Sequence, residues 1–177
     1  MDLFVPCGSA AYFTLLGLVL LARGADFLST WVATPHLVLE ANPLARALGW
    51  RWGTVVNAVL AACVALWPLP AVIVATASLL VAARNFQSAW LARSLGESAY
   101  RSWLGERLAE TRRGLFLACV VAQASLVASV GALLVYFNPA ESLATAVGLG
   151  IVTYALATVI FPVWGAWKMW RDPREPR

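Results

Sequence analysis

The chain has 177 residues, of which 61% are hydrophobic and only 12% charged, and its formal net charge is +4. Charged residues make up about a quarter of an ordinary soluble domain, so a water-soluble globule of this size would lack the polar side chains to cover its surface. The high apolar content and low net charge also exclude intrinsic disorder. The sequence therefore predicts an all-α integral membrane protein with one transmembrane domain over residues 1–177.

Five apolar stretches approach the roughly 20 residues that a membrane-spanning helix needs. They predict a five-helix transmembrane bundle with spans at residues 10–33, 54–67 (from 43 if flanking arginines snorkel), 71–90, 114–137 and 142–167. Pro68 and Pro70 predict a turn between the second and third spans, because proline cannot continue a helix. Pro162 predicts a kink or local break in the fifth span.

Basic residues alternate with the predicted spans in a regular way. Lys and Arg fall between spans one and two, between spans three and four, and after span five, whereas the segments around Pro68 and Pro139 have none. By the positive-inside rule, the N-terminus lies outside and the C-terminus in the cytoplasm.

Residues 95–113 predict a different kind of helix. Tyr100, Trp103, Leu104 and Leu108 recur at helical spacing and charged residues occupy the other faces. This pattern favours an amphipathic helix on the cytoplasmic surface, with membrane lipids as partners through their anionic headgroups; the alternative is an ordinary solvated connector. Because the basic residues follow the inner membrane face, we do not expect nucleic-acid binding.

Ionic side chains lie inside otherwise apolar spans, where each costs roughly 2.5–3.5 kcal/mol on insertion scales. Arg23 and Asp26 are three residues apart on one helix face and are expected to pair, with Thr30 one turn further. Arg84, next to Asn85, lies as deep in the third span as Arg23 in the first, and Asn57 enters the second span at a similar level. Neighbouring spans would thus bring these groups into one polar cluster near the cytoplasmic side.

The first connection adds Glu40 and Asn42 to this cluster. Asn42-Pro43 is typical of a helix start, with Asn as N-cap and Pro in the first position, and free N–H groups there favour an anion. Glu40 is expected to fold back toward Arg84 or Arg23, which would balance the two arginines and two acids.

The pattern Asp26-x3-Thr30 followed by Glu40-x-Asn42-Pro43 resembles a family of small, uncharacterised prokaryotic membrane proteins. The resemblance covers residues 10–90 and implies a multi-pass protein of a prokaryotic inner membrane. Where that family has a lysine in its second helix, this chain has Asn57. The resemblance implies a site without naming its ligand.

These observations predict a site that binds a small polar or ionic solute, with transport as its expected use. Its ligand-binding residues are Arg23, Asp26, Thr30, Glu40, Asn42, Asn57, Arg84 and Asn85. The alternative is a self-satisfied network that only fixes helix register. An arginine without a partner favours anion binding, and full mutual pairing favours the structural network.

Catalysis is not expected. His36 is the only histidine, no recognised hydrolase motif is present, and two arginines would repel a metal cation from Asp26 and Glu40. Three scattered cysteines predict neither a disulfide framework nor a zinc site, and the sequence identifies no cofactor.

A competing function is that of a non-catalytic accessory or scaffolding subunit of a larger membrane complex. Small residues recur at four-residue spacing in the fourth span, a pattern that permits close helix packing. They are Ala118, Ala122, Ser125 and Ser129. The sequence leaves open whether they meet another span, a second copy of the chain or a partner subunit.

Overall fold

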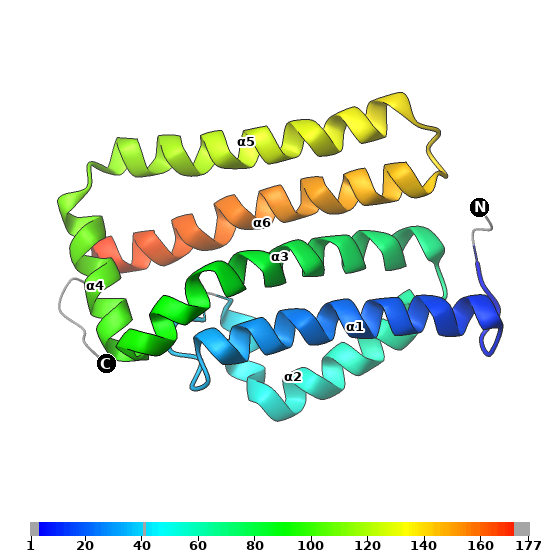
Figure 1. The fold of residues 1–177 in the computed structure, drawn as a ribbon, viewed down its shortest axis with the longest axis horizontal. Helices are drawn as coiled ribbons and strands as arrows, with labels where there is room; N and C mark the ends of the chain where they lie inside the picture. The colour runs from blue at the N-terminus through cyan, green and yellow to red at the C-terminus, as the bar shows by residue number, and fades with distance from the viewer. Residues whose placement is uncertain (1–3, 41, 172–177) are drawn as a thin grey trace.

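A computed structural model describes residues 4–40 and 42–171, and the regular structure in this part is entirely helical (Figure 1). The helices are α1 (Ala10–Ala33), α2 (Pro43–Val64), α3 (Pro68–Leu95), α4 (Glu97–Glu110), α5 (Arg113–Phe137) and α6 (Leu143–Arg171). Helices α1, α2, α3, α5 and α6 are each long and apolar enough to cross a membrane. The predicted number of helices able to span a membrane is confirmed, and α4 falls within the predicted 95–113 segment.

Local chemistry sets where the first helices begin. Ser9 caps α1 by accepting a hydrogen bond from the Tyr12 amide at 3.1 Å. Asn42 caps α2 as predicted, because its side chain accepts from the Leu44 amide at 3.0 Å. Helix α2 therefore begins at Pro43, the earlier of the two predicted starts, and ends at Val64 rather than at residue 67.

The prediction that Pro68 and Pro70 form a turn was wrong. They lie in the first turn of α3, where their missing N–H groups have no helical partner to lose. The chain reverses one step earlier, over residues 65–67. Helix α6 continues through Pro162, so of the two alternatives predicted there the local break is wrong.

Gly49 divides α2 into a short first segment and a long second one. Its backbone has φ 61° and ψ −170°, a conformation that glycine adopts readily and that a Cβ atom makes costly. The Trp50 indole then donates a hydrogen bond to the Pro35 carbonyl at 2.8 Å and its ring meets Phe27 edge-on. The bend therefore fixes the short segment of α2 beside the α1–α2 connection.

Four long helices lie side by side in the order α1, α3, α6, α5, and α2 diverges from this layer beside α1 (Figure 1). Small residues make the close contacts: alanines of α3 such as Ala71, Ala75 and Ala82 are buried. Gly150 of α6 lies against Thr76 of α3. The tightest packing of α1 is against α3 rather than against α2, although α2 contacts both of them.

One end of the bundle carries α4, the α1–α2 connection, the end of α3 and the end of α6 (Figure 1); we call it the α4 end. Basic residues of these segments gather there, and several cover tryptophan rings. Arg93 lies over Trp31 at 5.8 Å, and Arg171 lies over Trp167 at 4.6 Å. In the described residues, the connections at the opposite end contain no Lys or Arg.

The row of small residues predicted on the fourth span lies on the outside of α5. Ala118, Ala122, Ser125 and Ser129 are all exposed, whereas α5 meets α6 through Gly131 and Gly148. The row is therefore not buried against another span in the described part of the chain.

Candidate functional site

Arg23 is the centre of a hydrogen-bonded cluster that joins three helices. Its guanidinium donates to Asn57 Oδ1 of α2 at 2.6 Å, to Asp26 Oδ2 at 2.9 Å and to Ser78 Oγ of α3 at 3.2 Å. Asn57 in turn donates to the Gly53 carbonyl at 2.7 Å. The pairing of Arg23 with Asp26 is confirmed, and Asn57 lies in the same cluster, as its depth in the second span predicted.

A second cluster links α3 to α1 one turn away. The side-chain amide of Asn85 donates to Ser29 Oγ at 3.2 Å and to Thr30 Oγ1 at 3.3 Å. Ser29 is fully buried and donates to the Asp26 carbonyl at 2.8 Å. Ser29 and Ser78 were not among the predicted residues, since serine inside an apolar helix carries no signal of its own.

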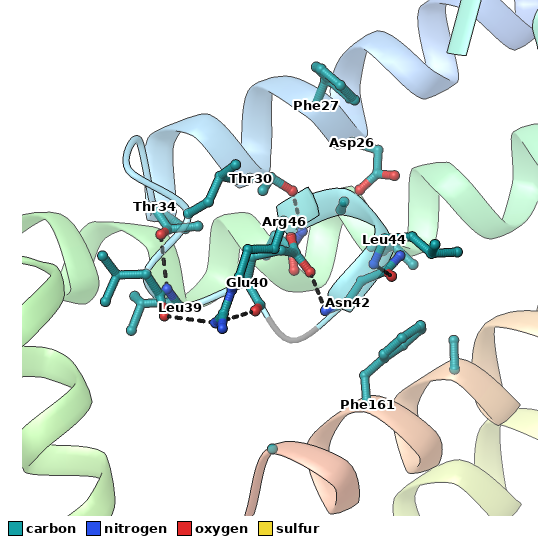
Figure 2. Close-up of a pocket in the computed structure, with 18 of the residues that line it drawn as sticks. Asp26, Phe27, Thr30, Thr34, Leu39, Glu40, Asn42, Leu44, Arg46 and Phe161 are labelled. Carbon is teal, nitrogen blue, oxygen red and sulfur yellow. Dashed lines mark hydrogen bonds between the residues drawn. The ribbon is translucent and has the colours of Figure 1, made fainter. Parts of the chain in front are cut away.

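Beside these clusters lies a cavity of about 720 Å³, hereafter the cavity. Its walls are α1, the α1–α2 connection, α2, α3, α4 and α6. Figure 2 shows Asp26 and Thr30 of α1, Glu40 and Arg46, and Phe161 of α6 around the same space. All of the predicted ligand-binding residues line it: Arg23, Asp26, Thr30, Glu40, Asn42, Asn57, Arg84 and Asn85.

The α1–α2 connection does not fold as expected. Glu40 accepts a hydrogen bond from the Asn42 amide at 2.7 Å, and within the described residues it forms no ion pair with Arg84 or Arg23. Arg46 donates instead to the main-chain carbonyl of Glu40 at 2.9 Å (Figure 2). Glu40 forms this local hydrogen bond rather than an ion pair, because the Asn42 amide is only two residues away and can be reached without ordering any more of the chain.

Arg84 is consequently left without a partner among the described residues. It is half-buried and lines the cavity, yet it makes no hydrogen bond or ion pair with any residue in 4–40 or 42–171. The cavity walls carry five basic side chains against two acidic ones, Asp26 and Glu40. The basic ones are Arg23, Arg46, Arg84, Arg101 and Lys168. The cavity therefore has an excess of positive charge.

Helices α4 and α6 complete the cavity, although the sequence reasoning placed the site in the first three spans alone. Tyr154, Thr158, Phe161 and Lys168 repeat at helical spacing along α6 and all line it. Tyr154 is almost buried, and its hydroxyl has no hydrogen-bond partner among the described residues. Hydropathy does not reveal which spans are neighbours, so nothing in the sequence linked α6 to Arg84.

Glu97, at the start of α4, holds the α1–α2 connection in place. Its carboxylate accepts from the Thr34 hydroxyl at 2.6 Å, the His36 amide at 3.0 Å and the Val38 amide at 3.2 Å, and lies 2.8 Å from His36 Nδ1. Its side chain is only 12% exposed. These hydrogen bonds, which we call the Glu97 clamp, hold the segment that leads to Glu40, a residue of the cavity wall. The sequence gives no sign of the clamp, because its partners lie about 60 residues apart.

Burial raises the pKa of Glu97, but the hydrogen bonds from Thr34, His36 and Val38 outweigh it and hold the pKa below 4.5, the ordinary glutamate value. A group whose pKa is lower in the folded state adds stability above its unfolded pKa and loses it as pH falls through the folded pKa. We therefore expect amide protection of residues 34–39 to be constant above pH 4.5 and to fall below it. Hydrogen exchange measured against pH checks this, with Glu97→Gln as the variant that shows a lower and flatter profile. An unchanged profile in Glu97→Gln would contradict the clamp.

The polar groups of the cavity suit the binding of an anion. No group of three or more His, Cys, Asp or Glu in the described residues is arranged to hold a metal ion. Besides the carboxylates of Asp26 and Glu40, the polar groups are guanidinium and ammonium donors, amides and hydroxyls, and the charged donors bind oxyanions by charge-assisted hydrogen bonds. Comparisons with protein-family models, curated proteins and solved structures found no match to this chain. The functional argument therefore depends on the site itself.

Proposed function

We propose that this protein binds an anionic solute in the cavity, at the cytoplasmic side of a prokaryotic inner membrane, and that movement of this solute across the membrane is its use. Arg84 carries the proposal. An intramembrane arginine is costly, and one that lines a cavity and forms no ion pair with a described residue is positioned to receive a negative charge from a ligand.

The proposed roles follow from the hydrogen bonds. Arg23 is already satisfied by Asp26, Asn57 and Ser78, so it holds the helices in place and adds little to the ligand. Asn85 donates to α1, and its carbonyl oxygen remains for a hydroxyl or protonated group. Arg84 binds the anion, and Arg101 and Lys168 raise the local anion concentration at the α4 end.

The orientation forms part of the same proposal. The α4 end carries the basic connections, and the opposite end has none within the described residues. We place the α4 end in the cytoplasm by the positive-inside rule, with the N-terminus outside and α4 at the headgroup level. The cavity then opens near the inner face.

Purified protein in detergent should be stabilised by anions and not by cations. We expect phosphate, sulfate and small organic phosphates to raise the melting temperature of the wild type, since a ligand at about 100 times its Kd stabilises by about 2.7 kcal/mol. Arg84→Gln should lose this response, and Arg112→Gln, which removes an arginine outside the cavity, should keep it. Efflux of the same anions from liposomes then tests movement. Stabilisation by Mg²⁺ or K⁺, or an anion response that survives in Arg84→Gln, would count against the proposal.

The exposed row on α5 favours a second candidate, the accessory subunit of a membrane complex. Ala118, Ala122, Ser125 and Ser129 permit close approach of another helix. Stoichiometric co-purification of another membrane protein, lost in Ala122→Phe, together with no anion response, would favour this role.

A further inference from the structure

The cavity is much larger than a simple anion needs. A volume of about 720 Å³ corresponds to some two dozen water molecules at roughly 30 Å³ each. It lies within the range of roughly 300–1,000 Å³ for pockets that hold organic molecules. The ligand of Arg84 therefore has a substantial part beyond its charged group.

Charged side chains of the cavity that make no hydrogen bond or ion pair with a described residue lie at or near the α4 end: Arg84, Arg101 and Lys168. Further from that end the walls carry the apolar Leu60 of α2, Val81 of α3 and Ala157 of α6. Arg23 and Asn57 line this apolar part as well, but they are already hydrogen-bonded to each other. Arg84 lies between the two parts, about 16 Å along α3 from its end at Leu95. A molecule that fills this space is polar at one end and apolar at the other.

The cavity also faces the lipid between α2 and α6. Helix α2 packs on α1 and α3, whereas the main neighbours of α6 are α3, α5 and α4. Leu60 and Phe161 line the cavity from these two helices and remain 42% and 37% exposed. On spanning helices, exposed leucine and phenylalanine side chains meet acyl chains, so a hydrocarbon chain passes between α2 and α6 without leaving an apolar medium.

We propose that the anion bound by Arg84 is the headgroup of a lipid, an inference that rests on the proposed function. The hydrocarbon chain of this lipid lies in the apolar part of the cavity and reaches the bilayer between α2 and α6. A phosphate headgroup fits best, because guanidinium binds phosphate through two parallel hydrogen bonds. Arg101 and Lys168 lie on the same side to balance its second charge. The hydroxyl of Tyr154, without a partner among the described residues, lines the same space.

Three ligands separate the contributions of head and tail. Dioleoyl phosphatidic acid has both, glycerol phosphate has the head alone, and dioleoylglycerol has the tails alone. Titration into the detergent-purified full chain, followed by native mass spectrometry, should show phosphatidic acid binding at least tenfold more tightly than either of the others. Arg84→Gln and Leu60→Trp should each weaken it at least tenfold, the second by filling the apolar part. Leu126→Trp, on the exposed face of α5, is the matched control and should have no effect.

A photoreactive group near the middle of the acyl chain provides a readout that needs no variant. It should label peptides containing Leu60 and Phe161. Glycerol phosphate that binds as tightly as phosphatidic acid, and depends on Arg84, would overturn the lipid inference and leave the proposed function standing. Binding of neither phosphate would overturn both. Labelling spread evenly over α5 would overturn the placement of the chain between α2 and α6.

Discussion

Replacing Gly148 by alanine is expected to separate α5 from α6 and to be among the most destabilising single-methyl changes in this protein. A Cβ atom at Gly148 would lie 2.6 Å from the Gly131 carbonyl oxygen, 2.9 Å from Leu134 Cβ and 3.0 Å from Val135 Cγ2. The nearest atom belongs to the main chain and cannot rotate away, so the helices must move apart. Overpacking costs about 1–3 kcal/mol, and we expect the upper part of this range.

The same helix provides the control. A methyl group at Gly165 of α6 would meet no side chain and no other helix within 4 Å. Gly165→Ala should therefore be neutral or stabilising by up to about 1 kcal/mol, because alanine favours helix more than glycine does. Gly131→Ala should resemble Gly148→Ala, since the contact is reciprocal. The free energy of unfolding in mixed micelles, measured for the wild type and each of the three variants, tests these expectations. Equal stability of Gly148→Ala and Gly165→Ala would show that α5 does not pack on α6 through these glycines.

The spans were predictable because apolar length is a property of the sequence alone. The predicted first span matches α1 at both ends, and the fifth overlaps α6 over nearly its whole length. The errors occurred where one residue type has two roles. Proline ends a helix when it follows one and begins a helix when it lies in the first turn. Pro68 and Pro70 do the latter.

The polar cluster was predictable in depth but not in direction around the helix axis. Counting residues along each span placed Arg23 and Asn57 at one level, and they bond at 2.6 Å. The same count cannot tell which way two consecutive residues point. Asn85 turns toward Ser29 and Thr30 of α1, while Arg84 lines the cavity without a partner among the described residues. That difference comes from packing, and it is the observation on which the proposal of a binding site depends.

Replacing Arg23 by leucine should destabilise the protein by about 3 kcal/mol, more than the loss of any other single polar group in the cluster. Arg23 bonds to α1, α2 and α3 at once, and its loss leaves the Asp26 carboxylate, only 17% exposed, without its counter-charge. Breaking one member of a buried pair costs about 3–5 kcal/mol because the other charge remains. The lower end applies here, since both side chains border the cavity.

The double variant Arg23→Leu/Asp26→Leu separates charge from packing. If the uncompensated carboxylate causes most of the loss, removing it as well should restore a large part of the stability, and the double-variant cycle should show a coupling of about 1–3 kcal/mol. Asp26→Leu alone should cost less than Arg23→Leu, because Arg23 keeps its hydrogen bonds to Asn57 and Ser78. Thermal unfolding of the four proteins in one detergent measures the cycle. Additive losses would mean that Arg23 stabilises the protein by joining three helices and that its charge contributes little. Of the two arginines, Arg23 and Arg84, only Arg84 would then have a role that depends on charge, since it makes no hydrogen bond to another helix among the described residues.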